Sequence, residues 1–189
     1  MKFEQYLDEM TSRQAAFSFG SFNPPNQEHV SFTTSLMSQV KNRRDGFIFV
    51  DSNTGPLEEA DQLKYLRMLV PQMASNIVVN ENISNILDIA VWLDQKGYSS
   101  IRMVAPAPEI KEARALLVKF NGVEGDHGKY QFQTIQVIAH KTKTDDVTEN
   151  MISAAVDDNF DAFSAGLPAT YIQIKELFEA VKDGLDNEI

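Results

Sequence analysis

Short apolar runs alternate with amphipathic segments along most of the chain. Four apolar runs of strand length are found at residues 15–19, 46–50, 76–79 and 100–105, and residues 132–139 alternate between apolar and polar positions as a fifth strand. Between them, apolar residues at helical spacing predict helices over residues 29–41, 57–69, 83–96 and 109–120. Strands that alternate with helices in this way predict an α/β fold: a doubly wound, mostly parallel five-stranded sheet with helices on both faces, as in Rossmann-like proteins.

The pattern also predicts helices outside this alternating region. A short amphipathic helix is expected at about residues 2–11, before the first strand. After the fifth strand, helices are expected within about residues 146–185, at 151–156, 159–165 and 169–185. No repeat, low-complexity stretch or linker interrupts the sequence, so residues 1–189 are expected to form one domain.

Composition narrows the possible functions. The chain has 189 residues, of which 43% are hydrophobic, and a formal net charge of −10. Such an acidic chain is unlike proteins that bind nucleic acid by neutralising phosphates. There is no Cys, hence no thiolate metal site, and we expect no metal site. No apolar run is long enough for a membrane span, and the acidic N-terminus is unlike a signal peptide, so we expect neither membrane binding nor export.

The stretch from Ala15 to His29 is the most informative part of the chain. A short buried strand ends at Gly20, a Pro-rich turn follows, and a helix opens near His29. Free N–H groups and the helix dipole at such a helix start attract anions. The sequence therefore predicts a phosphate-binding loop, although His29 taken alone is more typical of a histidine that holds the turn together.

The same stretch resembles the first motif of the HIGH-type nucleotidyltransferases, Gly-x-Phe-x-Pro-x-(His/Thr)-x-Gly-His. Four residues match this motif: Gly20, Phe22, Pro24 and His29. Asn26 stands where the first His or Thr belongs, and Glu28 stands where the Gly belongs. The resemblance implies the nucleotidyltransferase fold and a vestigial phosphate loop, with Asn26 and His29 as the vestiges of the catalytic residues.

Beyond this loop, about residues 14 to 185 are similar to a phage-encoded, cytidylyltransferase-like group of these enzymes. In that group a Gly-Ser-Asp-Arg segment follows the fourth strand, where this chain has Ala-Pro-Ala-Pro at residues 105–108. A Ser-Ala-Ser-Lys-Met-Arg segment opens a late helix. Here its Lys falls on Asn150, its Arg on Ile152, and a hydroxyl position on Val147 or Glu149. The resemblance thus implies a kept scaffold and lost reactive residues.

Three functions follow from this resemblance. The first is a catalytically inactive nucleotidyltransferase-like protein with a structural or binding role, such as a component of a phage virion or its assembly, found in the virion or the host cytoplasm. Its partners would be other protein chains, and no cofactor is expected. The second is an active adenylyl- or cytidylyltransferase that uses ATP or CTP with Mg²⁺ and releases pyrophosphate. The third is a sensor that binds nucleotide without turnover.

Other polar residues give weaker signals. His127 lies in a Gly-rich loop over residues 121–130, and both His127 and His140 are expected to face solvent. Asp145, Asp146 and Glu149 could bind a divalent cation, but carboxylates are also common at helix starts. If the nucleotide site is lost, the loop and the acidic C-terminal helix are the surfaces where a protein partner is expected.

Overall fold

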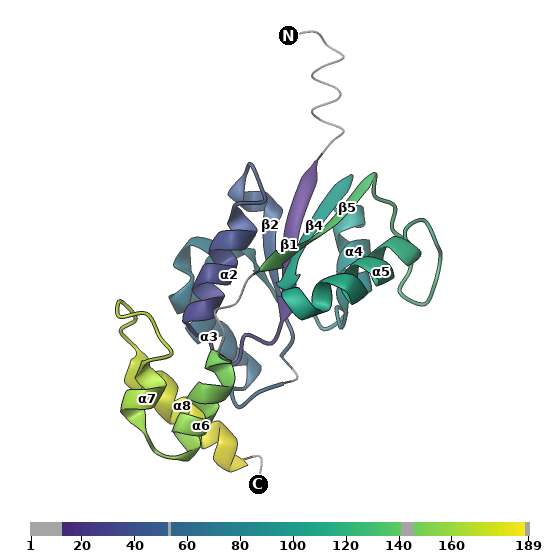
Figure 1. The fold of residues 1–189 in the computed structure, drawn as a ribbon. Coiled ribbons are helices and arrows are strands. Elements are labelled where there is room, and N and C mark those ends of the chain that lie inside the picture. Colours follow the sequence, from purple (N-terminus) through teal and green to yellow (C-terminus); the bar gives the residue numbers. More distant parts are fainter. Residues whose placement is uncertain (1–12, 53, 141–145, 188–189) are drawn as a thin grey trace. The chain divides into compact units, whose positions relative to one another are not determined.

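The structure, a computed structural model, describes residues 13–52, 54–140 and 146–187 (Figure 1). The helix predicted at about 2–11 lies outside these residues. The sheet consists of β1 (Gln14–Gly20), β2 (Gly46–Val50), β3 (Ile77–Val78), β4 (Ser100–Pro106) and β5 (Thr134–His140). Its strands are parallel and lie in the order β3-β2-β1-β4-β5. The predicted α/β fold with a five-stranded parallel sheet is confirmed.

The strand order reverses direction at β1. From β1 the chain moves outward to β2 and β3, and it then returns to β4 on the other side of β1. The connections contain α2 (Gln27–Met37), α3 (Glu59–Leu69), α4 (Ile86–Gln95) and α5 (Ile110–Lys119). This is the doubly wound, Rossmann-like arrangement, in which ligands bind at the carboxyl ends of the strands near the reversal.

Some element boundaries differ from the predicted ones because side chains bond to the backbone. The helix expected from residue 83 begins at Ile86, since Asn85 caps it by accepting from the N–H groups of Leu87 and Asp88. The fifth strand begins at Thr134 and not at Phe132. The Asn121 side chain bonds both to the Phe132 N–H and to the Phe132 carbonyl, at 2.8 and 3.0 Å.

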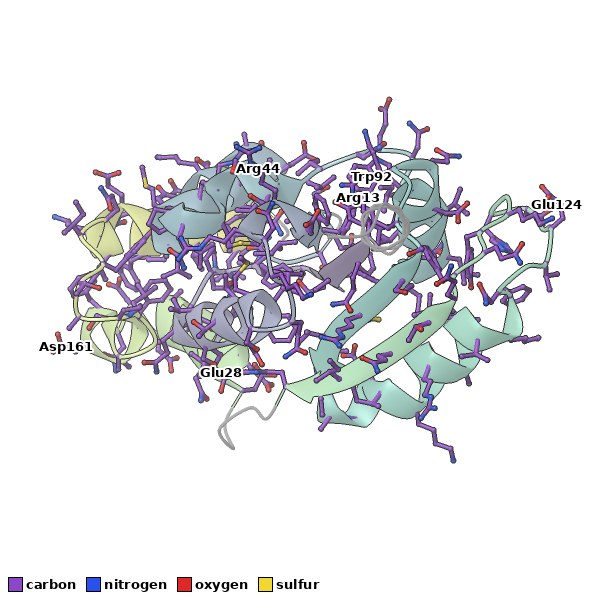
Figure 2. The ribbon with its side chains drawn as sticks, turned by 90° about the horizontal axis from the view of Figure 1, so that it is seen from above. Arg13, Glu28, Arg44, Trp92, Glu124 and Asp161 are labelled. Atoms are coloured by element: carbon purple, nitrogen blue, oxygen red, sulfur yellow. The ribbon has the colours of Figure 1, made fainter. Side chains whose placement is uncertain are left out.

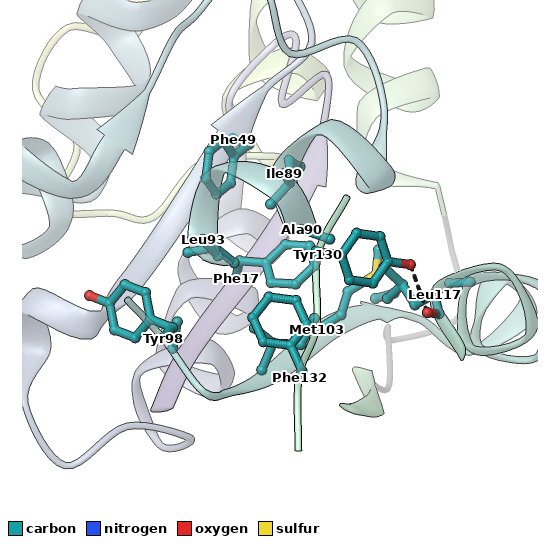
Figure 3. Packing of buried hydrophobic residues seen from close by; sticks show 14 residues of the cluster. Phe17, Phe49, Ile89, Ala90, Leu93, Tyr98, Met103, Leu117, Tyr130 and Phe132 are labelled. Atoms are coloured by element: carbon teal, nitrogen blue, oxygen red, sulfur yellow. Dashed lines mark hydrogen bonds between the residues drawn. The ribbon is translucent and has the colours of Figure 1, made fainter. Parts of the chain in front are cut away.

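Close contacts divide the chain into two compact units. Of the described residues, unit 1 comprises 13–19, 35–49 and 78–140, and unit 2 comprises 20–34, 50–52, 54–77 and 146–187. Unit 1 contains most of the sheet together with α4 and α5. In Figure 3 its core joins Phe17 and Met103 on strands to Leu93 and Leu117 on helices. Unit 2 contains the turn after β1, α3 and the C-terminal helices.

The loop over residues 121–130, expected to lie outside the core, ends in a core residue. Tyr130 is fully buried, and its hydroxyl donates to the Leu117 carbonyl at 2.7 Å (Figure 3). The Gly122 N–H donates to the Tyr130 carbonyl at 2.8 Å, with Gly122 at a φ of 81° that favours glycine. The loop is therefore tied to the core at its end, and the expectation is wrong for Tyr130.

The C-terminal part of unit 2 consists of α6 (Val147–Val156), α7 (Phe160–Ser164) and α8 (Ile174–Asn187). The helix predicted from residue 169 starts later, because a turn bonds the Tyr171 N–H to the Pro168 carbonyl at 2.9 Å. The apolar stripe of α8 is buried, and the Phe178 ring lies 5.1 Å from that of Phe163. None of the helices in the described ranges is long and apolar enough to cross a membrane.

Candidate functional site

The turn after β1 is a tight, buried structure within unit 2. Gly20, at the end of β1, accepts through its carbonyl from the Asp51 N–H at 2.9 Å. Phe22 is buried at a φ of 50°, a conformation that costs a non-glycine residue of order 1–3 kcal/mol. The Phe22 ring packs edge-on against the His29 ring, with 5.0 Å between ring centroids. Pro24, two residues further along the chain, is also buried. Strain of this kind is often kept at functional turns.

Asn26 is the N-cap of α2, and it accepts hydrogen bonds from the first amides of that helix. Its side-chain oxygen accepts from the Glu28 N–H at 3.0 Å, and its carbonyl accepts from the His29 N–H at 3.1 Å. The Asn26 N–H donates to Nδ1 of His29 at 3.0 Å. The Gln27 N–H donates to the Gly166 carbonyl at 2.9 Å. The four amides that could bind a phosphate thus all have acceptors within the protein.

The start of α6 contacts this turn and is also capped. The Asn26 side-chain amide donates to the Thr148 hydroxyl at 2.8 Å. Asp146 accepts through its carboxylate from the Glu149 N–H at 3.1 Å. A carboxylate cap satisfies the helix dipole and repels a phosphate from the same place. The resemblance implies a hydroxyl position at Val147 or Glu149. Thr148, the residue between them, is the one whose hydroxyl contacts the turn.

The electrostatics of this site are negative or neutral. Burial lowers the pKa of His29 to about 4, although the Asp146 carboxylate opposes the shift. The ring is therefore neutral at pH 7, and its Nδ1 already accepts a hydrogen bond. Neither segment 20–34 nor segment 146–166 contains a Lys or Arg. A triphosphate bound at this site would therefore face carboxylates such as Glu28 and Asp146. It would meet no Lys or Arg from these two segments.

Two buried amide side chains hold the turn next to the segment that leads into α3 and to α3 itself. Neither was predicted from the sequence. Asn23 donates to the Leu57 carbonyl at 2.8 Å and accepts from the Leu57 N–H at 3.1 Å. Gln62, fully buried on α3, donates to the carbonyls of Ser21 and Asp51. An Asn within a Pro-rich turn and a Gln on the apolar face of a helix are the only sequence signals for these roles.

Other residues singled out in the sequence lie elsewhere. Residues 105–108 complete β4 and enter a 3-10 turn in unit 1, with no Asp or Arg among them. His127, also in unit 1, is half-buried with its ring 5.1 Å from that of Phe120.

His140 was expected to face solvent, but it is buried. The reason is that β5 continues to His140, in register with Pro106. Asp145 lies outside the described residues, so the proposed cation cluster of Asp145, Asp146 and Glu149 is only partly described. Within the described ranges, no group of three or more His, Cys, Asp or Glu residues is placed to hold a metal ion.

The arrangement around Asn26 and His29 is thus a closed turn, in which the amides at the start of α2 bond to acceptors within the protein. Neither a comparison with protein-family models nor one with curated proteins finds a match for this chain.

Proposed function

We propose that this chain is a nucleotidyltransferase-like protein without transferase activity, and that it acts by binding other protein chains, as a component of a phage virion or its assembly. The resemblance of the Gly20–His29 turn to the HIGH-type motif supports descent from a nucleotide-binding loop. Loss of the charged positions supports loss of turnover. The doubly wound fold is compatible with many functions, so the function follows from the site and not from the fold.

One observation carries the proposal: the donors at the start of α2 are all used inside the protein. Phosphoryl transfer relies on preorganised donors and cations aimed at charge that develops on the phosphates. Here a nucleotide would have to break the bonds from Gln27 to Gly166 and from Asn26 to His29 before it could use those amides. It would also approach Glu28 and Asp146, whose carboxylates repel phosphate.

The first prediction concerns turnover. We expect no pyrophosphate release above background when the protein is incubated with ATP or CTP, Mg²⁺ and common phosphate or carboxylate acceptors. The physical reason is that segments 20–34 and 146–166 contain no Lys or Arg, and that the four described amides at the start of α2 already have acceptors. A coupled pyrophosphate assay measures this, with His29→Ala and His127→Ala as matched variants. Turnover that disappears in His29→Ala but persists in His127→Ala would contradict the proposal and favour an active transferase.

The second prediction concerns nucleotide binding. Each missing charge-assisted hydrogen bond costs about 1.5–3 kcal/mol of binding energy, so the loss of several lowers affinity by orders of magnitude. We expect no heat of binding in calorimetry with millimolar ATP or CTP and Mg²⁺. Micromolar binding that is lost in His29→Ala would contradict this and favour a nucleotide sensor.

A further inference from the structure

The two units differ in charge. Within the described residues, unit 2 contains fourteen Asp and Glu residues against four Lys and Arg, whereas unit 1 contains eight against ten. The excess of negative charge of this acidic chain is therefore concentrated in unit 2, and unit 1 is slightly positive. Figure 2 labels Arg13 and Arg44 among the cations of unit 1 and Asp161 among the anions of unit 2.

Three of the ten described cations of unit 1 line a groove of about 620 Å³ near the start of the parallel strands. The residues lining the groove come from β1, β4 and the segment after α2: Arg13, Gln14, Ser38, Gln39, Val40, Lys41, Asp45 and Arg102. Exposed Arg44 follows Lys41 closely in the chain. The groove thus contains three cations and one carboxylate, in a protein whose net charge is −10.

Within the groove the single carboxylate is already neutralised. Asp45 accepts from Arg13 at 3.4 Å and from the Tyr98 hydroxyl at 2.8 Å, and the Arg13 guanidinium lies 4.4 Å from the centre of the Tyr98 ring. Lys41 is exposed. No carboxylate among the residues lining the groove is therefore left to neutralise the positive charge of Lys41 and Arg102.

Arg102 is held in place by neutral groups. Its Nε donates to the Gln136 side chain at 2.8 Å, and one of its terminal nitrogens donates to the Gln39 carbonyl at 3.2 Å. No ion pair joins Arg102 to a carboxylate of the described residues. A half-buried guanidinium that is fixed in this way has already lost its rotamer freedom, so a carboxylate that binds it incurs little ordering cost.

Unit 2 carries a surface of the opposite charge. On α8, Glu176, Glu179, Asp183 and Asp186 follow one another at spacings of three, four and three residues, and all four are exposed. This spacing places them along one side of the helix. We call these four residues the acidic ridge. Lys182 of α8 bonds to Asp158. Lys64 and Lys175 line the surface beside Glu176, Glu179 and Asp183, so the four carboxylates of the ridge outnumber these two cations.

We propose that the groove of one copy binds the acidic ridge of α8 of a second copy, so that the chain associates head to tail. This inference builds on the proposed protein-binding function and names the partner. Complementary charges on two different surfaces of one chain give a heterologous interface, which forms rings or open filaments, and both suit a component of an assembly. A helix laid in a groove is a recurrent way for proteins to bind.

The test is sedimentation velocity of the full chain over a series of concentrations. We expect concentration-dependent association at about 0.05 M salt that weakens toward about 0.5 M, because screening shortens the reach of exposed charges. The variant Lys41→Glu/Arg44→Glu should weaken association about tenfold or more, and so should Glu179→Lys/Asp183→Lys. Both variants change exposed residues only, so they should remain folded by circular dichroism. An equimolar mixture of the two variants should recover association, because their charges are swapped.

A matched control is Lys111→Glu/Lys119→Glu on α5, which changes the net charge equally but lies outside the groove and should associate like the wild type. A wild-type protein that stays monomeric at low salt, a control that weakens association as much as the groove variant, or a mixture that fails to associate would each overturn the inference. A monomer without turnover or nucleotide binding would leave the proposed function standing. Turnover would contradict that function whatever the association.

Discussion

Replacing Gly184 by alanine is expected to destabilise the protein by about 3 kcal/mol, the cost of forcing atoms into a closely packed place. Gly184 lies within α8, where helix propensity alone predicts that alanine stabilises by about 1 kcal/mol. The backbone of Pro56 packs directly on this position. A Cβ at Gly184 would lie 2.7 Å from the Pro56 carbonyl carbon and still closer to its oxygen. Packing and propensity therefore predict effects of opposite sign.

Equilibrium unfolding in urea measures this effect, and Gly20→Ala is the matched control. A Cβ at Gly20 would lie 3.6 Å from the ring of Phe22, an ordinary contact, so Gly20→Ala is expected to change stability by less than about 0.5 kcal/mol. If Gly184→Ala were as stable as the wild type, α8 could not approach Pro56 as closely as the structure has it.

Four of the five strands could be predicted from the sequence because buried parallel strands are short apolar runs. The fifth, β5, lies at the edge of the sheet and is only partly buried, and it was found from its alternation of apolar and polar residues. Their ends were less predictable where a side chain competes for backbone bonds. Asn121, which bonds to Phe132, and Asn85, which caps α4, both shift a boundary. His140 was misjudged because the polar residues that follow it suggested a loop, whereas the ladder with β4 extends through it.

The candidate site was predictable only in its local part. The motif placed Asn26 and His29 in one turn, and the structure brings them into contact. Their other partners could not be read from the pattern, since Thr148 and Gly166 are more than a hundred residues away in the sequence. Nor does a motif show whether a helix start is open or closed. That depends on which acceptors the folded chain brings to its amides.

Lowering the pH from 7 to about 4 is expected to remove about 3 kcal/mol of stability through His29 alone. Burial lowers the pKa of His29 from 6.5 to about 4 in the folded protein. Between these values the unfolded chain binds the proton and the folded chain does not, so protonation favours unfolding. The contribution of His29 is fully present above pH 6.5 and is lost as the pH falls toward 4. Protonation of Nδ1 would also remove the acceptor of the Asn26 N–H.

Urea unfolding of the wild type and of His29→Gln at pH 7 and near pH 4 isolates this effect from that of the carboxylates, which titrate in both proteins. His29→Gln should be the less stable protein at pH 7, because the half-buried imidazole and its bond to Asn26 are lost. Near pH 4 the difference in free energy of unfolding between the two proteins should shrink by about 3 kcal/mol. The reason is that the unfolded wild-type chain then binds a proton at His29 that the folded wild type holds only weakly. His127→Gln controls for the removal of an imidazole outside unit 2. An equal difference between wild type and His29→Gln at both pH values would show that His29 is not held neutral, and the turn would then be more open to anions than its hydrogen bonds indicate.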